Sequence, residues 1–173
     1  MPRPVAFAVF LLLPLVAFLA GCSGPAPYRY RYIPGKTAVL RGGTAIAPAS
    51  APARVRAAID AGNRIAGKPY RYGGGHGRFD DTCDTGYDCS GAASFVLRAA
   101  GGLREPMPSK AFRRFGEGGE GDWISVYARR DHVFLVVAGL RFDTGWTHGA
   151  PGPRWTTGGR PTNNCVIRHP VGL

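Results

Sequence analysis

The stretch GYDCSGAASFVL, residues 86–97, places a single cysteine, Cys89, between an acidic residue and a predicted helix. From about Ser90 to Ala100 apolar residues recur at helical spacing, and the Gly101-Gly102 pair ends the pattern. The free N–H groups and the dipole at the beginning of a helix stabilise negative charge, so a thiol there ionises more readily than an ordinary thiol. Cys89 is therefore a candidate nucleophile, and such a nucleophile needs a base and a third group that orients the base.

The N-terminal end of the sequence resembles the signal of a bacterial lipoprotein. After Arg3, the segment Val5–Ala20 is almost wholly apolar, but it is shorter than the ~20 residues of a transmembrane helix. It ends in the sequence Leu-Ala-Gly-Cys at Cys22. The resemblance implies that residues 1–21 are a removed signal peptide and that Cys22 is lipidated. The protein would then be anchored in the bacterial cell envelope, on the periplasmic side of a membrane, with the outer membrane favoured where the host has one. The alternative is an ordinary secretory signal with an incidental cysteine.

The rest of the chain divides into a predicted tether and a predicted domain. Residues 22–51 are rich in Pro, Ala, Gly and Ser without sustained periodicity, which is typical of a flexible tether. Within them Tyr28, Tyr30 and Tyr32 alternate with arginine, as in an exposed strand. Residues 52–173 are enough for one small domain with a single core.

In the predicted domain, helical patterns come first and strand patterns follow. The predicted helices span residues 52–67, 90–100 and 108–116, and the predicted strands span 122–128, 132–139, 140–144 and 165–169. A glycine- and proline-rich loop is expected over 149–164. Helices followed by strands predict an α+β fold with helices packed on one face of an antiparallel sheet.

The chain carries a net charge of +11, mostly from arginine. The arginines are scattered rather than clustered, so the charge indicates attraction to anions in general. For an exported protein we expect these anions to be phospholipid head groups, surface polymers or the carboxylates of cell-wall peptides, and not nucleic acid.

Among the four histidines, His132 differs because it opens an otherwise apolar strand. If Ala138 and Gly139 form a two-residue hairpin turn, Phe134 lies opposite Asp143, and alternation places His132 and Asp143 on one face as diagonal neighbours. Thr144 then points to the other face. The alternative for His132 is a buried structural role, and a solvated or hydrogen-bonded role is expected for the others, which are His76, His148 and His169.

Four motifs together resemble the NlpC-type cell-wall cysteine peptidases. They are GKPYRYGGG, GYDCSGAASFVLRAAGGL, GDWISVY and HVFLVVAGLRFDT, and the resemblance extends over about residues 52–144. It implies a papain-like α+β fold, without metal or cofactor, and hydrolysis of amide bonds in peptidoglycan stem peptides, commonly next to D-glutamate and diaminopimelate. We expect a monomer. The alternatives are an inactive peptidoglycan-binding lipoprotein and an acyl transferase that uses the same thioester.

The resemblance also implies roles for single residues. Cys89 matches the nucleophile and His132 the general base of the family. Tyr70 matches a tyrosine that lies beside the nucleophile and hydrogen-bonds in the site. Ser90 follows the nucleophile at the helix N-terminus, where donors would stabilise an oxyanion. Ser90 and the preceding Asp88 also admit purely structural roles.

The chain departs from the family pattern in two places. The third residue of the family is usually His, Asn or Gln, whereas Asp143 lies nearest to that position here. The segment between Tyr70 and Cys89 is longer than usual and adds an acidic cluster, which either contacts an amine of the substrate or is a solvated loop. The cluster consists of Asp80, Asp81 and Asp84.

Two cysteines remain without an assigned role. In an oxidising envelope Cys83 and Cys165 are expected to pair as a disulfide. A zinc site is the alternative, although the spacing between Cys83 and Cys89 does not match the usual short ligand spacing. Its ligands would be Cys83, Cys89, Cys165 and His169.

Overall fold

The computed structural model describes residues 26–77 and 82–173. The predicted signal peptide and the predicted lipidation site, Cys22, lie outside these residues. Within the described residues, no helix combines the length and apolarity that a membrane span requires.

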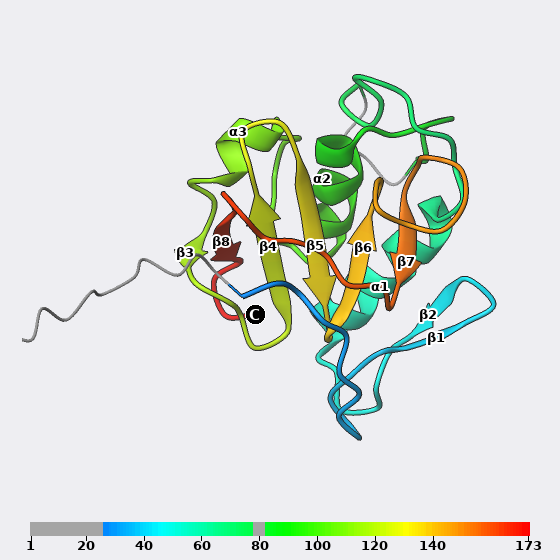
Figure 1. The fold of residues 1–173 in the computed structure, drawn as a ribbon, viewed down its shortest axis with the longest axis vertical. Helices are drawn as coiled ribbons and strands as arrows, with labels where there is room; N and C mark the ends of the chain where they lie inside the picture. Colours follow the sequence, from blue (N-terminus) through cyan, green and yellow to red (C-terminus); the bar gives the residue numbers. More distant parts are fainter. Residues whose placement is uncertain (1–25, 78–81) are drawn as a thin grey trace, which may run out of the picture.

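A six-stranded antiparallel sheet forms the centre of the fold, with the strand order β3-β8-β4-β5-β6-β7. Its strands are β3 (Glu117–Gly118), β4 (Ile124–Ala128), β5 (Val133–Val137), β6 (Leu140–Asp143), β7 (Arg154–Thr156) and β8 (Val166–His169). The helices are α1 (Ala53–Ile65), α2 (Cys89–Ala99) and the short α3 (Ser109–Phe112). Helices α1 and α2 pack against each other and against one face of the sheet (Figure 1). The predicted α+β class, with helices packed on an antiparallel sheet, is confirmed.

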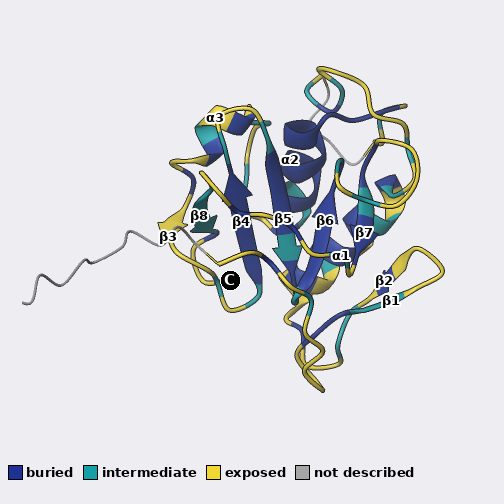
Figure 2. Cartoon of the chain, in the orientation of Figure 1, coloured by how far each residue is buried: buried dark blue, intermediate teal, exposed yellow. Residues whose placement is uncertain are grey.

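The core lies between these two helices and the sheet. In β5, alternation turns Val133, Leu135 and Val137 toward the helices, and all three are buried. Figure 2 shows α2 and the central strands as mostly buried. Because α2 packs on β5, the beginning of α2 lies beside the beginning of β5. The domain thereby brings Cys89 close to the residue that precedes β5, His132.

Helix α2 begins where the sequence predicted, because Asp88 caps it. The Asp88 carboxylate accepts a hydrogen bond of 2.7 Å from the Gly91 amide. A loop rich in glycine packs against this first turn so closely that a Cβ atom on Gly91 would lie 2.0 Å from the Gly74 carbonyl oxygen. Glycine at residue 91 is therefore required for the loop to approach the beginning of the helix.

The hairpin of β5 and β6 has the predicted register. Val137 pairs with Leu140, and Leu135 pairs with Phe142. Ala138 and Gly139 form the turn with φ values of 44° and 73°, and two positive φ values are typical of a type I′ turn. Asp143 consequently lies on the face of the hairpin that the sequence predicted.

The predicted flexible tether over residues 22–51 is wrong for its described part. Strands β1 (Val39–Arg41) and β2 (Thr44–Ile46) form a hairpin, which Asn63 of α1 holds by two hydrogen bonds to Ala45. The Gly42-Gly43 pair between the strands is a recognised signal for a two-residue hairpin turn. The sequence contained this signal, but the surrounding Pro and Ala content obscured it.

The segment before this hairpin crosses the face of the sheet that the helices leave uncovered (Figure 1). Tyr28 forms a backbone bridge with Arg160, and its hydroxyl donates a hydrogen bond of 2.9 Å to the Gly139 carbonyl. Tyr28 is only 8% exposed. The third layer of the fold is therefore built from residues that were predicted to lie outside the domain.

The remaining differences concern short edge strands. β7 lies inside the loop predicted over residues 149–164, and β3 was not predicted. Both are edge strands that pair with a single neighbour, and strands this short carry no readable alternation.

The docked N-terminal segment predicts a stability difference between two tyrosines. Replacing Tyr28 with alanine should reduce the free energy of unfolding by about 3 kcal/mol, because a buried aromatic ring is lost. Replacing Tyr32, which is 55% exposed, should change it by less than about 0.5 kcal/mol. Urea denaturation of both variants measures the difference. Equal, near-zero effects would show that residues 26–33 are a free tether after all.

Candidate active site

Cys89 is the first residue of α2 and is 8% exposed. Its thiol hydrogen-bonds to the ring of His132 and lies 3.3 Å from the Ser109 hydroxyl. Burial favours the neutral thiol, but the hydrogen bonds from His132 and Ser109 and the charge of His132 outweigh burial, so the pKa of Cys89 lies below its ordinary value. The sulfur is thus prepared for ionisation.

The orientation of His132 is fixed by Asp143. The Nε2 atom of His132 lies 2.8 Å from Oδ1 of Asp143, which leaves Nδ1 for the thiol. Burial alone would lower the pKa of His132, but the hydrogen bonds to Asp143 and Cys89 raise it to about 9. A raised histidine pKa beside a lowered thiol pKa favours a thiolate–imidazolium pair at neutral pH.

Two arginines hold Asp143 on its other side. Its carboxylate is fully buried, forms an ion pair with Arg141, and lies 3.5 Å from the Nε of Arg160. The Gly145 amide donates a further hydrogen bond of 3.1 Å. Arg141 in turn donates a hydrogen bond to the Trp146 carbonyl. These contacts make Asp143 the centre of a buried charge network that joins β6 to the loops after it.

The beginning of α2 offers backbone donors beside the sulfur. The Gly91 amide donates a hydrogen bond to the Asp88 carboxylate, and the Ala92 amide donates one to the Asp88 backbone carbonyl. Within the described residues, the amides of Cys89 and Ser90 have no acceptor. They are the donors that can stabilise an oxyanion formed at Cys89.

Ser90 contributes its amide rather than its side chain to this arrangement. The Ser90 hydroxyl donates to Asp88 at 3.0 Å and lies 3.1 Å from Nε2 of His76. His76 also bonds Asp88 at 3.2 Å, which raises the pKa of His76. Burial opposes ionisation of Asp88, but the hydrogen bonds from His76, Gly91 and Ser90 lower its pKa to about 2. Asp88 thus ties the glycine loop to the helix.

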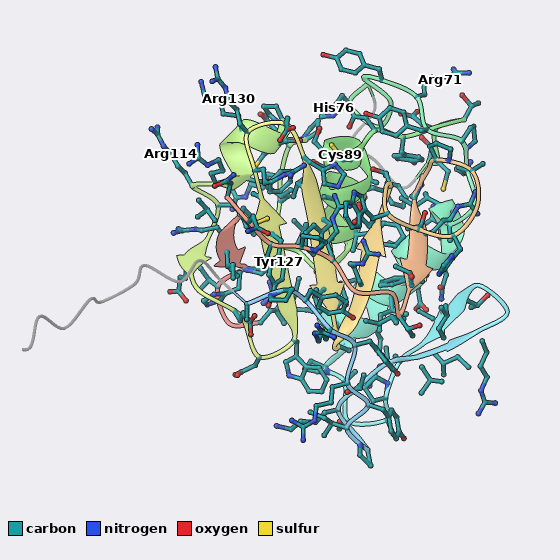
Figure 3. All side chains as sticks on the ribbon, viewed as in Figure 1. Arg71, His76, Cys89, Arg114, Tyr127 and Arg130 are labelled. Carbon is teal, nitrogen blue, oxygen red and sulfur yellow. The ribbon has the colours of Figure 1, made fainter. Side chains whose placement is uncertain are left out.

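An open cleft of about 430 Å³ leads to the sulfur. It is lined by the glycine loop with Tyr70 and His76, by the beginning of α2, by residues 108–110 and by Arg130 and Asp131. Figure 3 labels His76, Cys89 and Arg130 in the same upper part of the molecule. A peptide can therefore reach Cys89 between the loop on one side and residues 108–110 and 130–131 on the other.

Tyr70 lines this cleft, as the sequence resemblance implied, and is 43% exposed. Partial burial, followed by the charge of nearby Cys89, raises the pKa of Tyr70. Its hydroxyl makes no hydrogen bond within the part of the chain that the structure describes. The position of Tyr70 agrees with the expectation, whereas the expected hydrogen bond is absent from the described residues.

The expected disulfide between Cys83 and Cys165 is not formed, and both are free thiols. Cys83 is exposed and lies 3.6 Å from a guanidinium nitrogen of Arg64 on α1, whereas Cys165 precedes β8. The fold thus places Cys83 in the loop before α2, beside α1, and Cys165 in the turn before β8, an arrangement that spacing in the sequence could not reveal. Across residues 26–77 and 82–173 no cluster of three or more His, Cys, Asp or Glu has the arrangement of a metal site. The alternative zinc site is therefore not formed.

The acidic cluster of the long loop is described only in part. Asp80 and Asp81 lie outside the described residues. Asp84 accepts a hydrogen bond of 2.8 Å from the Gly75 amide, so it supports the glycine loop.

The structure brings Cys89, His132, Asp143, Tyr70 and the Ser90 amide together as the sequence predicted. Sequence reasoning missed several residues that contact this group, namely His76, Ser109, Arg141 and Arg160. The alternation that placed Asp143 also places Arg141 on its face, and this was a usable signal. Nothing in the local sequence marks Ser109. Compared with models of known protein families and with curated proteins, the chain matches none.

Asp143→Asn tests the role of the carboxylate. The change removes the negative charge and weakens the hydrogen bond that raise the pKa of His132, so the midpoint of the His132 titration should move from about 9 to lower pH. Ring-nitrogen chemical shifts measured by NMR report this midpoint directly. The same variant leaves Arg141 and Arg160 buried without their counterion, and should lose about 3 kcal/mol of stability.

Thr144→Val is the matched control. Thr144 is buried on the opposite face, and its hydroxyl has no partner among the described residues, so valine should change neither the titration nor the stability by much. An unmoved His132 titration in Asp143→Asn, together with a large shift in Thr144→Val, would contradict the assignment.

Proposed function

We propose that this chain is a papain-like cysteine peptidase of the NlpC type that hydrolyses amide bonds in the stem peptides of peptidoglycan. The observation that carries the proposal is the buried line of Cys89, His132 and Asp143, in which the thiol pKa is lowered and the histidine pKa is raised. A structural cysteine has no need of such partners. An open cleft at the sulfur is the second requirement of a nucleophile that acts on a peptide.

The arrangement of elements supports the papain-like part of the proposal. The nucleophile opens a helix that packs on an antiparallel sheet, the base immediately precedes β5, and the neighbouring strand β6 supplies the residue that orients it. The stem-peptide substrate is supported by the sequence motifs alone.

In the proposed mechanism, the Cys89 thiolate attacks the carbonyl carbon of the scissile amide. A carbon–sulfur bond forms, and the electron pair of the carbonyl moves to oxygen, where the Cys89 and Ser90 amides stabilise it. As the carbon–nitrogen bond breaks, protonated His132 delivers its proton to the leaving amine. The first step therefore ends with an acyl thioester and neutral His132.

Water completes the cycle. His132 takes a proton from water while the oxygen attacks the thioester carbon, and the carbon–sulfur bond breaks. The product leaves with a new carboxyl group, and the thiolate–imidazolium pair is restored. Asp143 keeps the ring in one orientation and stabilises its charge throughout.

Replacement of the nucleophile tests the activity. Cys89→Ala and Cys89→Ser should abolish cleavage of purified muropeptides, with products identified by mass, while the thermal unfolding transition stays within a few degrees of that of the unsubstituted protein. Iodoacetamide at a pH of about 6 should label Cys89 before Cys165, because the pKa of Cys89 is lowered by its hydrogen bonds whereas burial raises the pKa of Cys165. Undiminished cleavage by Cys89→Ala would end the cysteine-peptidase proposal.

The masses of the reaction products also distinguish hydrolysis from the two alternatives, acyl transfer and binding without catalysis. Addition of water to the cleaved fragment indicates hydrolysis, and incorporation of a supplied amine indicates an acyl transferase. Binding of muropeptides without any product would indicate an inactive binding protein.

We also propose that Cys22 carries the lipid that anchors the protein in the cell envelope. Cys22→Ala should then move the protein from the membrane fraction to the soluble fraction, because an acylated terminus is what retains it. Fractionation and immunoblotting measure the change, and muropeptide cleavage by the released protein should be unaltered. Retention of Cys22→Ala in membranes would show that another segment holds it there.

A further inference from the structure

We propose that residues 29–36, the basic loop, form a membrane-contacting surface that binds anionic lipid head groups and buries two apolar side chains among them. The surface itself rests on the side chains that the basic loop exposes. Its position next to a membrane rests on the acylation of Cys22 proposed above.

The basic loop exposes cations and apolar side chains together. Its sequence is Arg-Tyr-Arg-Tyr-Ile-Pro-Gly-Lys, and its three cations, Arg29, Arg31 and Lys36, are exposed. Tyr32 is 55% exposed and Ile33 is 46% exposed. Cations bind lipid phosphates, whereas tyrosine and aliphatic side chains favour the boundary between head groups and acyl chains. A soluble polyanion would use the cations alone, so the two exposed apolar side chains indicate a bilayer.

Hydrogen bonds hold the basic loop in one conformation. The Lys36 and Thr37 amides donate to the Ile33 carbonyl at 3.1 and 3.0 Å. The Thr37 hydroxyl accepts a hydrogen bond of 3.0 Å from the Ile33 amide and donates one of 3.2 Å to the Arg31 carbonyl. The loop therefore presents Ile33 to solvent in a fixed position, and binding does not cost the conformational entropy that a free segment would lose.

The cations of the basic loop have no counterion among the described residues. Glu120 and Asp122 line the groove beside the loop, but in residues 26–77 and 82–173 neither forms an ion pair with the three cations. Glu120 instead accepts a hydrogen bond of 2.5 Å from the Tyr127 hydroxyl. Each cation near an anionic membrane strengthens binding roughly fivefold, so three give about a hundredfold. This affinity orients an anchored domain but does not retain an unanchored one.

The basic loop lies at the end of the domain opposite the cleft. The Ala38 amide donates a hydrogen bond of 2.7 Å to the Ala138 carbonyl, which places the loop at the turn after β5. His132 precedes the other end of β5, whose five residues span roughly 17 Å. The blue segment reaches the lowest part of the view in Figure 1, whereas Cys89 and Arg130 are labelled in the upper part of Figure 3. A domain bound through the basic loop therefore turns its cleft away from the bilayer.

Two lysines allow the surface to be tested. Lys36 belongs to the basic loop, Lys110 lies beside the cleft, and both are exposed. Acetic anhydride is neutral and acetylates exposed amines, so the ratio of acetylation at Lys36 to that at Lys110 reports whether the basic loop is covered. The protein is purified as the cell produces it, in an uncharged detergent, and reconstituted with vesicles. These consist of phosphatidylcholine alone or contain about 30% anionic phosphatidylglycerol, and mass spectrometry gives the ratio.

We expect the acetylation ratio to be about fivefold lower on the anionic vesicles than on the neutral ones. The difference should shrink in about 1 M salt, which screens exposed charges. Combining Arg29→Gln with Arg31→Gln should reduce the difference to less than about twofold. Combining Arg71→Gln with Arg130→Gln is the matched control and should leave it unchanged, since both arginines are labelled at the other end of the molecule in Figure 3.

Other occupants of the surface give different results. Combining Tyr32→Ala with Ile33→Ala should also reduce the difference, because a bilayer takes up apolar side chains. A difference that this variant leaves unchanged would assign the basic loop to a soluble polyanion and overturn the proposal. The proposal is equally overturned by an acetylation ratio that is the same on both kinds of vesicle, or by one that falls only as the protein concentration rises, which indicates contact between copies.

Sedimentation of the vesicles separates this surface from the proposed lipid anchor. Protein that sediments with both kinds of vesicle at an unchanged ratio keeps the anchor and overturns the surface. Protein that sediments only with the anionic vesicles, at a lowered ratio, keeps the surface and overturns the anchor. Sedimentation with neither overturns both. Cleavage of soluble muropeptides should be the same with and without the Arg29→Gln and Arg31→Gln changes, so the peptidase proposal is tested independently.

Discussion

The buried carboxylate of Asp143 is the interaction on which the rest of the site depends. It contacts His132 on one side and Arg141 and Arg160 on the other, so one negative charge fixes the ring of His132 and neutralises two buried guanidinium groups. Taking such charges out of water costs several kcal/mol for each ion, and only close pairing offsets this cost. The loop with Arg160 is therefore held to β6 by the carboxylate that orients His132, and the loop with Trp146 is held by Arg141, the ion-pair partner of this carboxylate.

A second carboxylate performs a similar task at the other end of the site. Asp88 caps α2, hydrogen-bonds to His76 and accepts a hydrogen bond from the Gly73 amide. These contacts hold the glycine loop over the beginning of the helix. Among the described residues, the sulfur of Cys89 has hydrogen bonds to His132 and Ser109 rather than to either carboxylate. Its ionisation is favoured instead by His132 and Ser109, against the opposing effect of burial. The site thus combines a rigid frame with a single reactive atom at the floor of an open cleft.

Local sequence patterns predicted those parts of the site that depend on residues close together in the sequence. Helical spacing identified α2, and strand alternation with a two-residue turn placed Asp143 beside His132. The contacts of Arg160 and Ser109 could not be predicted, because they depend on how distant loops fold back over the sheet. The separation of Cys83 from Cys165 was missed for the same reason. The docking of Tyr28 was missed because the segment has the composition of a linker, and composition does not show whether a single aromatic side chain packs against the sheet.

The docked N-terminal segment has a consequence for where the protein can work. The carbonyl of Ala26, the first described residue, accepts a hydrogen bond of 2.9 Å from Thr162, so the chain is attached to the domain at this residue. Only four residue steps separate Ala26 from Cys22, a reach of at most roughly 14 Å even when fully extended. If Cys22 is acylated as proposed, the domain cannot move far from the membrane surface. Its working depth is then set by its own diameter, and it meets only the layer of the wall nearest the bilayer.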